Sequence, residues 1–122
     1  MTTEYAKSVL YDNCTCTEGS FIEYLHECSE FSVEAFWAYY DCLATLSRLP
    51  REEKTFELTA MVSFSYNRIL TEYIAHFDPN DICDIDGFPD DWYAYKERLD
   101  FAFGAYMMMN TMPDDESFEL KR

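Results

Sequence analysis

Hydrophobic residues recur at steps of three and four along most of this chain, the spacing that places them on one face of an α-helix. The longest such segment runs from Phe56 to Phe77 and, between its two glutamates, holds a single charged residue, Arg68. A second face of the segment is apolar as well, through Phe64, Leu70, Ile74 and Phe77. A helix that is apolar on more than one side must be enclosed by other elements. We therefore predict that this helix, starting at Pro50 or Thr55, is the centre of a bundle.

Four further segments carry the same periodicity between helix start and stop signals. They cover residues 3–11, 21–30, 33–49 and 90–110. Ser20 with Glu23 forms a capping box, Ser32 is a second N-cap, and Pro89 suits the start of the last helix. The long helix ends before Pro79, because proline disfavours helical geometry in the residue that precedes it.

No segment alternates between apolar and polar residues for long enough to predict a strand, and the chain has no internal repeat. We predict a single all-α domain over 1–122, a compact bundle of about four main helices plus a short N-terminal helix. An acidic loop at 78–91 connects the last two helices. The acidic segment 113–122 begins at a proline, and we expect it to form a flexible tail.

The composition is that of a folded protein with an unusual charge. Asp and Glu number 24 against 9 Lys and Arg, a formal net charge of -15, yet 48% of residues are hydrophobic and 18% aromatic. The aromatic content supplies far more burial than a disordered chain carries. Nucleic acid and anionic membranes repel a polyanion, so we expect no direct binding to either. A basic protein surface would attract it.

The sequence also bears on the compartment. No apolar run approaches the roughly 18 residues of a spanning helix, and the N-terminus lacks the charged and apolar regions of a signal peptide. We therefore expect a cytoplasmic protein with reduced thiols. Its five cysteines are Cys14, Cys16, Cys28, Cys42 and Cys83.

Two metal sites can be drawn from the sequence, and both are incomplete. With Gly87 as the turn glycine of an EF-hand, the first and last ligand positions fall on Ile82 and Tyr93, which cannot serve. A zinc site from the Cys14–Cys16 pair with His26 and Cys28 fails because helical residues two apart point in different directions. We expect no metal and no other cofactor.

Catalytic motifs are missing as well. The chain has no Gly-rich phosphate loop, nucleophile elbow or metalloprotease helix, and neither His26 nor His76 stands in a recognisable catalytic pattern. Abundant carboxylates alone do not assign acid and base roles. We predict that the protein is not an enzyme.

The charges are segregated by sign along the chain. Lys and Arg are absent from 8–47 and again from 69–95, and each span holds seven acidic residues. Solubility of a small domain needs a net charge of only about 2 to 8. The excess therefore calls for a second explanation.

Two acidic rows stand out within these spans, and we predict that both bind a partner. The first is Glu23, Glu27, Glu30 and Glu34, and the second is Asp81, Asp84, Asp86, Asp90 and Asp91. The first row has helical spacing, which costs stability because like charges repel. Carboxylates about 5 to 6 Å apart have a charge density similar to that of phosphates on a nucleic-acid strand. Tyrosines beside acids, at Tyr39 or Tyr40, Tyr93 and Tyr95, could add aromatic contacts.

In size, acidity and aromatic content the chain resembles the DNA mimics encoded by phages and mobile elements, which block restriction enzymes, CRISPR complexes, uracil-DNA glycosylase or nucleoid proteins. No family motif accompanies the resemblance, so the candidate residues rest on charge pattern alone. It implies a nucleic-acid-mimicking inhibitor of the anti-restriction or anti-CRISPR type. Its partner would be a basic nucleic-acid-binding protein, such as a nuclease or a defence complex.

Two other hypotheses stay open at this stage. An antitoxin or immunity protein that neutralises one basic toxin would carry the same charge but depend on a few specific contacts. A small acidic adaptor subunit could instead form a homodimer through Met107, Met108, Met109 and the aromatic faces. Its affinity would depend little on salt, whereas both inhibitor hypotheses predict a steep decline with ionic strength.

Overall fold

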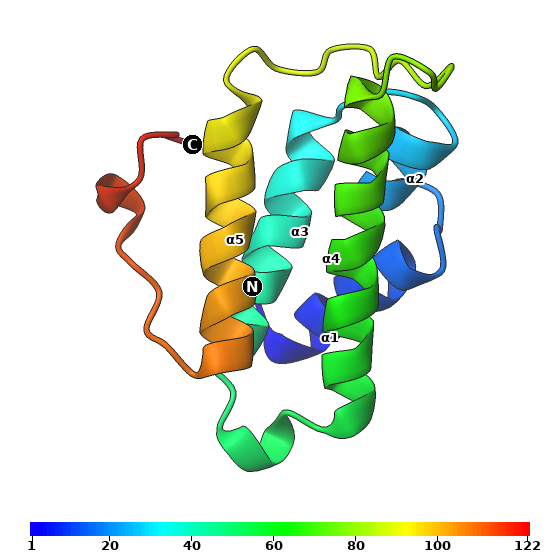
Figure 1. The fold of residues 1–122 in the computed structure, drawn as a ribbon. Coiled ribbons are helices and arrows are strands. Elements are labelled where there is room, and N and C mark those ends of the chain that lie inside the picture. The colour runs from blue at the N-terminus through cyan, green and yellow to red at the C-terminus, as the bar shows by residue number, and fades with distance from the viewer.

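Five α-helices and two short 3-10 turns follow one another in the computed structural model, which describes residues 1–122 (Figure 1). The α-helices are α1 (Thr3–Cys14), α2 (Phe21–His26), α3 (Val33–Ser47), α4 (Phe56–Phe77) and α5 (Trp92–Met108), and the 3-10 turns are Arg51–Glu53 and Asp115–Ser117. The predicted all-α bundle with a short N-terminal helix is confirmed. Side chains of Thr2, Ser20, Ser32 and Thr55 cap the helices that follow them, by accepting a backbone N–H three residues later.

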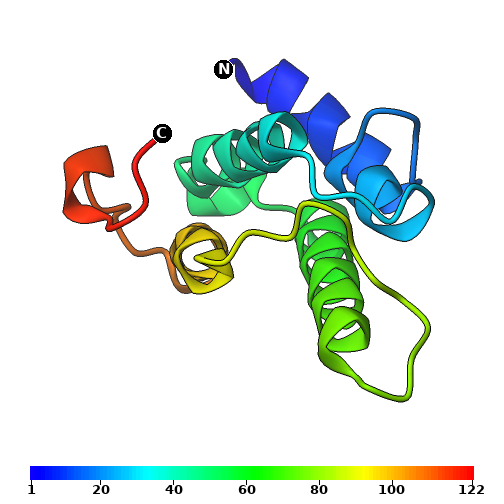
Figure 2. The same ribbon diagram turned by 90° about the horizontal axis from the view of Figure 1, so that it is seen from above.

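The central helix is α3, so the prediction that 55–77 is the centre was wrong. Seen from above, α3 lies between α1 and α5, while α4 stands at one edge (Figure 2). Nine residues of α3 are buried, compared with seven in the much longer α4. A chain of this length has too few helices to cover both faces of α4, and its second apolar face therefore stays exposed.

Aromatic side chains fill the core where α2, α3 and α5 meet. The Phe31 ring packs edge-on against the rings of Phe21 and Tyr95, each at a centroid distance of 5.3 Å. Phe36 joins the same cluster, 4.9 Å from Tyr95. Edge-to-face pairs of this kind contribute about 0.5 to 1.5 kcal/mol each beyond the burial of area. The cluster joins the turn before α3 to the helix that follows the acidic loop.

The first helix extends to Cys14, three residues beyond the predicted end. The residues beyond the predicted end are polar, and contacts with later segments of the chain satisfy their side chains. Asn13 is buried, and its Oδ1 accepts the backbone N–H of Ile22 at 3.1 Å while its Nδ2 donates to the carbonyl of Val9. Cys14 Sγ donates to the carbonyl of Met61 on α4. These bonds pair polar groups that would otherwise be costly to bury.

The second helix is shorter than predicted, ending at His26 instead of residue 30. Ser29 has a left-handed backbone (φ 49°), which stops the helix and turns the chain. The turn carries Phe31 into the aromatic cluster. Burial of one large ring outweighs the local preference of the segment for helix.

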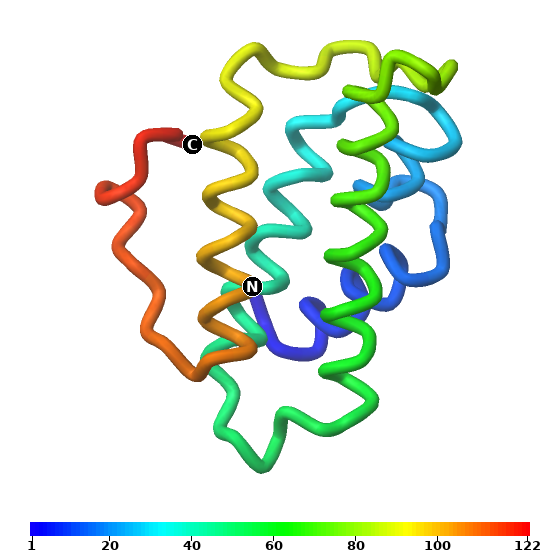
Figure 3. Tube along the Cα trace, in the orientation of Figure 1, coloured from blue at the N-terminus to red at the C-terminus, as the bar shows by residue number.

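The C-terminal segment 113–122 is not a flexible tail. After a left-handed turn at Met109, the chain runs back along α5 (Figure 3). Phe118 and Leu120 are buried, and the side chain of Arg98 is completely enclosed beneath them. Its guanidinium donates to the carbonyl of Leu120 at 2.7 Å and to Asp115 Oδ1 at 2.6 Å. The sequence did not predict the burial of Arg98, because helical periodicity does not show that a later segment will cover it.

Acid should loosen this tail. The guanidinium of Arg98 holds the pKa of Asp115 below its ordinary value of 3.8. A carboxyl with a lowered folded pKa adds stability above its unfolded pKa, and that stability is lost as the pH falls through the folded pKa. Docking of the tail should therefore be constant from neutral pH to about pH 5 and weaken below about pH 4.

Amide hydrogen exchange at Phe118 and Leu120 across this pH range measures the effect. Asp115→Asn should remove most of the pH dependence, whereas Asp114→Asn, an exposed neighbour without an ion pair, should leave it unchanged. An identical acid transition in wild type and Asp115→Asn would contradict the assignment.

Candidate acidic interaction surface

Two segments far apart in the sequence meet at one end of the bundle. The turn between α2 and α3 forms an isolated parallel bridge with the loop that follows α4. Phe31 donates its backbone N–H to the carbonyl of Asp86, and Asp86 donates its own to the carbonyl of Ser29, both at 2.8 Å. Glu30 and Asp86 are the bridged residues, so the two predicted acidic rows lie side by side. Figure 1 shows both segments at the top of the bundle.

We call this surface the acidic end, and it comprises eight of the nine predicted site residues. They are Glu27, Glu30, Glu34, Asp81, Asp84, Asp86, Asp90 and Asp91. All eight are exposed to solvent. The structure therefore brings the two acidic segments to one end of the bundle.

No Lys or Arg lies within 4.0 Å of any carboxylate of the acidic end. The ring nitrogens closest to it belong to imidazoles, since His26 Nε2 lies 3.8 Å from Glu27, and His76 Nδ1, which accepts the backbone N–H of Ile85, lies 3.8 Å from Asp84. Elsewhere carboxylates have strong partners, as in the 2.6 Å pair of Asp41 with Arg122. The acidic end thus keeps its negative charge available to an incoming molecule.

Glu23, the ninth predicted residue, differs from the others because its carboxylate is bonded within the fold. The predicted helical row is wrong, because α2 ends at His26 and no single helix carries the four glutamates. Glu23 is half-buried, and its carboxylate accepts the backbone N–H of Gly19 at 3.4 Å and the thiol of Cys28 at 3.3 Å. It stabilises the local fold around the start of α2.

Helix starts offset part of the repulsion within the acidic end. Glu34 lies in the first turn of α3 and Asp91 is the N-cap residue of α5, so both face the positive end of a helix dipole. Each such contact contributes about 0.3 to 1 kcal/mol. Glu30, Asp86 and Asp90 are neither N-cap nor first-turn residues, so no helix start offsets the repulsion between their charges.

Of the four candidate tyrosines, only Tyr93 is freely available to a partner. Its side chain is 63% exposed in the first turn of α5, next to the acidic end. Tyr39 and Tyr40 are buried in α3, and Tyr95 is half-buried in the aromatic cluster. The hydroxyl of Tyr39 is 2.7 Å from Ser65 Oγ, a bond that links α3 to α4.

The thiols and histidines do not assemble into a metal site. No group of three or more His, Cys, Asp or Glu side chains has the arrangement of a metal centre. Burial raises the pKa of Cys14 to about 11, and the bond to Glu23 raises the pKa of Cys28. His26 Nδ1 instead pairs with Glu72 Oε1 at 2.7 Å. All five cysteines are free thiols.

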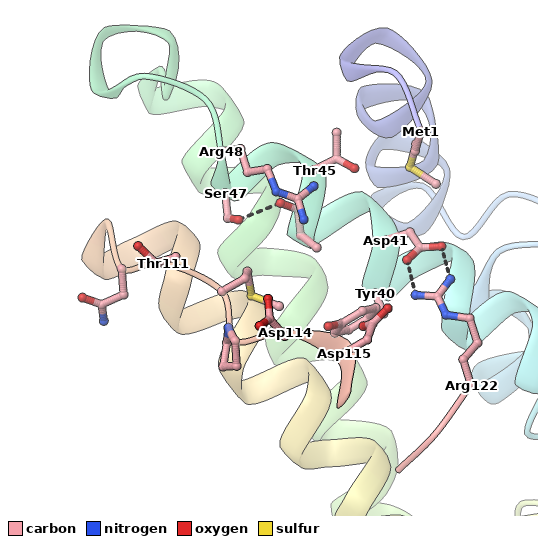
Figure 4. Close-up of a pocket in the computed structure, with 14 residues that line it drawn as sticks. Met1, Tyr40, Asp41, Thr45, Ser47, Arg48, Thr111, Asp114, Asp115 and Arg122 are labelled. Atoms are coloured by element: carbon pink, nitrogen blue, oxygen red, sulfur yellow. Dashed lines mark hydrogen bonds and ion pairs between the residues drawn. The ribbon is translucent and has the colours of Figure 1, made fainter. Parts of the chain in front are cut away.

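A polar pocket of about 590 Å³ lies between α3 and the C-terminal segment (Figure 4). Figure 4 shows Arg122 reaching Asp41 through two bonds, of 2.6 and 2.8 Å. Arg48 stands on the same wall, and Asp114 and Asp115 come from the C-terminal segment. Because side chains of both charge signs line the pocket, it favours neither a cation nor an anion. No nucleophilic side chain in the lining is paired with a base.

An apolar groove between α4 and α5 is the feature that the sequence interpretation missed. It has a volume of about 570 Å³ and is lined by Leu70, Tyr73, Ile74, Phe77, Asp78, Trp92 and Lys96. The second apolar face of α4 was the available signal, but we interpreted it as evidence of burial. Ile74 is in fact 69% exposed and Phe77 is 50% exposed.

No protein family, curated protein or solved structure matches this chain. None of its helices combines the length and the hydropathy that crossing a membrane requires.

Proposed function

We propose that this protein is a stoichiometric inhibitor that presents its acidic end to the basic groove of a nucleic-acid-binding protein, in place of a phosphate backbone. It would belong to the anti-restriction or anti-CRISPR class of phages and mobile elements and would act in the cytoplasm without catalysis. One observation supports the proposal above all. The bridge between Glu30 and Asp86 joins two acidic segments whose carboxylates are exposed and have no Lys or Arg partner.

The amount of charge supports an electrostatic role. Segments 27–34 and 78–91 hold nine carboxylates and no Lys or Arg. Such a concentration of one sign speeds association with an opposite surface, by factors of about 10 to 1000. It also costs stability through self-repulsion, which a function at this surface would explain.

The spacing is compatible with mimicry of a strand. Asp84 and Asp86 are two residues apart in an extended segment, which corresponds to about 6.6 Å along the chain. Glu30 lies on the bridged segment, whose backbone is about 4.8 Å away. Cationic side chains that contact successive phosphates can reach charges at these separations.

Neutralising the acidic end tests the proposal. The variant Glu30→Gln/Asp84→Asn/Asp86→Asn/Asp90→Asn should compete with a labelled DNA duplex at least about tenfold more weakly, mainly through slower association. The targets are a panel of purified restriction endonucleases, CRISPR nucleases and uracil-DNA glycosylase. Affinity of the parent should fall steeply as salt rises.

The control removes the same number of charges elsewhere. Glu52, Glu53, Glu57 and Glu119 are exposed and lie outside the acidic end. Their replacement by glutamine should change competition less than about twofold, because exposed charges beyond a Debye length are screened. Equal loss in both variants would show that only net charge matters. If the parent displaces DNA from none of these targets, the mimicry is refuted.

A further inference from the structure

The groove between α4 and α5 is open along its length and apolar at its walls. Leu70, Ile74 and Phe77 recur at steps of four and three on α4, which places them in one stripe facing Trp92 of α5. Ile74 and Phe77 on its α4 wall are exposed, so the groove does not enclose a small molecule as a ligand pocket does. An open apolar channel between two helices is suited to the apolar face of a third helix.

Ring contacts hold one wall of the groove in place. The Phe77 ring lies 5.0 Å from Trp92 and 5.3 Å from Phe88. Phe88 in turn stacks on His76 at 4.2 Å. Because these rings are already ordered, a docking helix would lose little free energy in arranging them.

The groove runs directly into the acidic end. Asp78 lines it and is also the first residue of the acidic loop that follows α4. Lys96 also lines the groove, but it is paired with Asp100 at 2.8 Å, so its positive charge is already compensated. A helix lying in the groove would therefore have one end among uncompensated carboxylates.

This charge arrangement selects the occupant. A parallel pair of copies docked through the groove would bring two acidic ends together, and each end repels the other. An antiparallel pair would not, and sedimentation distinguishes it from the occupant proposed below. The chain's own C-terminal segment is already bound at Arg98, on α5. The occupant that complements both the apolar walls and the carboxylates is a segment of another protein, apolar on one face and rich in Lys or Arg.

We propose that the groove binds an amphipathic helix of the target, with its apolar face on Ile74 and Phe77 and its cationic flank on the acidic end. The assignment rests on the proposed function, since it gives the same basic partner a second point of contact. The acidic end would set the rate of encounter, and the groove would slow dissociation.

Three synthetic helices test the assignment. The first has leucines at i, i+3, i+4 and i+7 with lysines elsewhere, the second replaces leucine by serine, and the third replaces lysine by glutamate. Trp37→Phe leaves Trp92 as the sole tryptophan, because the chain has two. The Leu/Lys helix should shift Trp92 emission to shorter wavelength with saturation. The other two should bind at least about tenfold more weakly, a difference that corresponds to about one lost anchor.

A matched pair of variants separates the groove from the acidic end. Ile74→Gln changes a residue of the groove lining. Phe64→Gln replaces a comparably exposed side chain that is not part of that lining. Ile74→Gln should weaken binding of the Leu/Lys helix at least about fivefold, while Phe64→Gln should not. Both positions are exposed, so neither variant should impair folding.

Four outcomes would overturn the proposal. They are unchanged binding to Ile74→Gln, equal binding of the Ser/Lys helix, equal binding of the Leu/Glu helix, and a dimer in sedimentation that Ile74→Gln disrupts. None of them depends on DNA competition. If the groove does not bind the Leu/Lys helix but the parent still competes with DNA, mimicry stands without this second contact. If the groove binds the Leu/Lys helix while competition fails, the docking site stands and mimicry falls.

Discussion

Replacing Phe31 by alanine should destabilise the protein by about 3 to 5 kcal/mol, the range typical of a buried phenylalanine. Phe31 is 6% exposed and contacts four other rings, those of Phe21, Phe36, Phe88 and Tyr95. The aromatic pairings are lost together with the buried area, and α3 and α5 leave little freedom for the cavity to collapse.

The same substitution should disturb the acidic end. The backbone of Phe31 donates to Asp86, so the ring holds in place the backbone bridge between the two acidic segments. Amide exchange at Asp86 should accelerate more than exchange within α4, because the bridge has only two backbone bonds. Chemical denaturation gives the stability change, and exchange at Asp86 gives the local effect.

Two variants calibrate this result. Phe31→Leu should cost clearly less than alanine, because it keeps most of the buried volume. Phe56→Ala removes a ring that is 85% exposed and should change stability by less than about 0.5 kcal/mol. A loss below about 1 kcal/mol for Phe31→Ala would mean that the aromatic cluster does not support this end of the bundle.

Arg98→Ala should release the C-terminal segment and cost about 3 kcal/mol, a value typical of a buried charge network that loses a member. The Coulomb term with Asp115 contributes little of this, because the Asp115 side chain is 67% exposed and solvent screens it. Most of the loss comes from the carbonyl of Leu120, which accepts two bonds from the guanidinium. The Phe118 ring, 4.1 Å from the guanidinium, adds a cation–π contact.

Arg98→Lys should recover only a small part of that stability. A lysine ammonium cannot reproduce the planar fork that reaches Leu120, Asp115 and the hydroxyl of Tyr40 together. Limited proteolysis after residue 109 and thermal unfolding measure the two effects. Arg51→Ala, at an exposed residue that has no ion pair and does not line the pocket beside the C-terminal segment, serves as the control. Protection of the segment from protease in Arg98→Ala would contradict this role.

The sequence predicted which residues form the candidate site but not how they are arranged in space. Eight of the nine acidic residues proposed from charge segregation are exposed in the structure, because unpaired carboxylates in spans without Lys or Arg have no reason to be buried. Their arrangement was predicted incorrectly. The spacing of Glu23, Glu27, Glu30 and Glu34 indicated one helix, but the left-handed turn at Ser29 divides them.

The sequence by itself determined where the first three helices begin, that there are no strands, and that negative charge is concentrated in two spans. These properties are local, because a capping side chain and a helical stripe act within a few residues. Only the tertiary structure decided that α3 is the centre, that Arg98 is buried and that α4 leaves a groove open beside Trp92. It also decided that Glu30 pairs with Asp86. Such contacts depend on which rings can pack together and which polar groups can form hydrogen bonds between distant segments. The periodicity of the sequence contains no information about these long-range contacts.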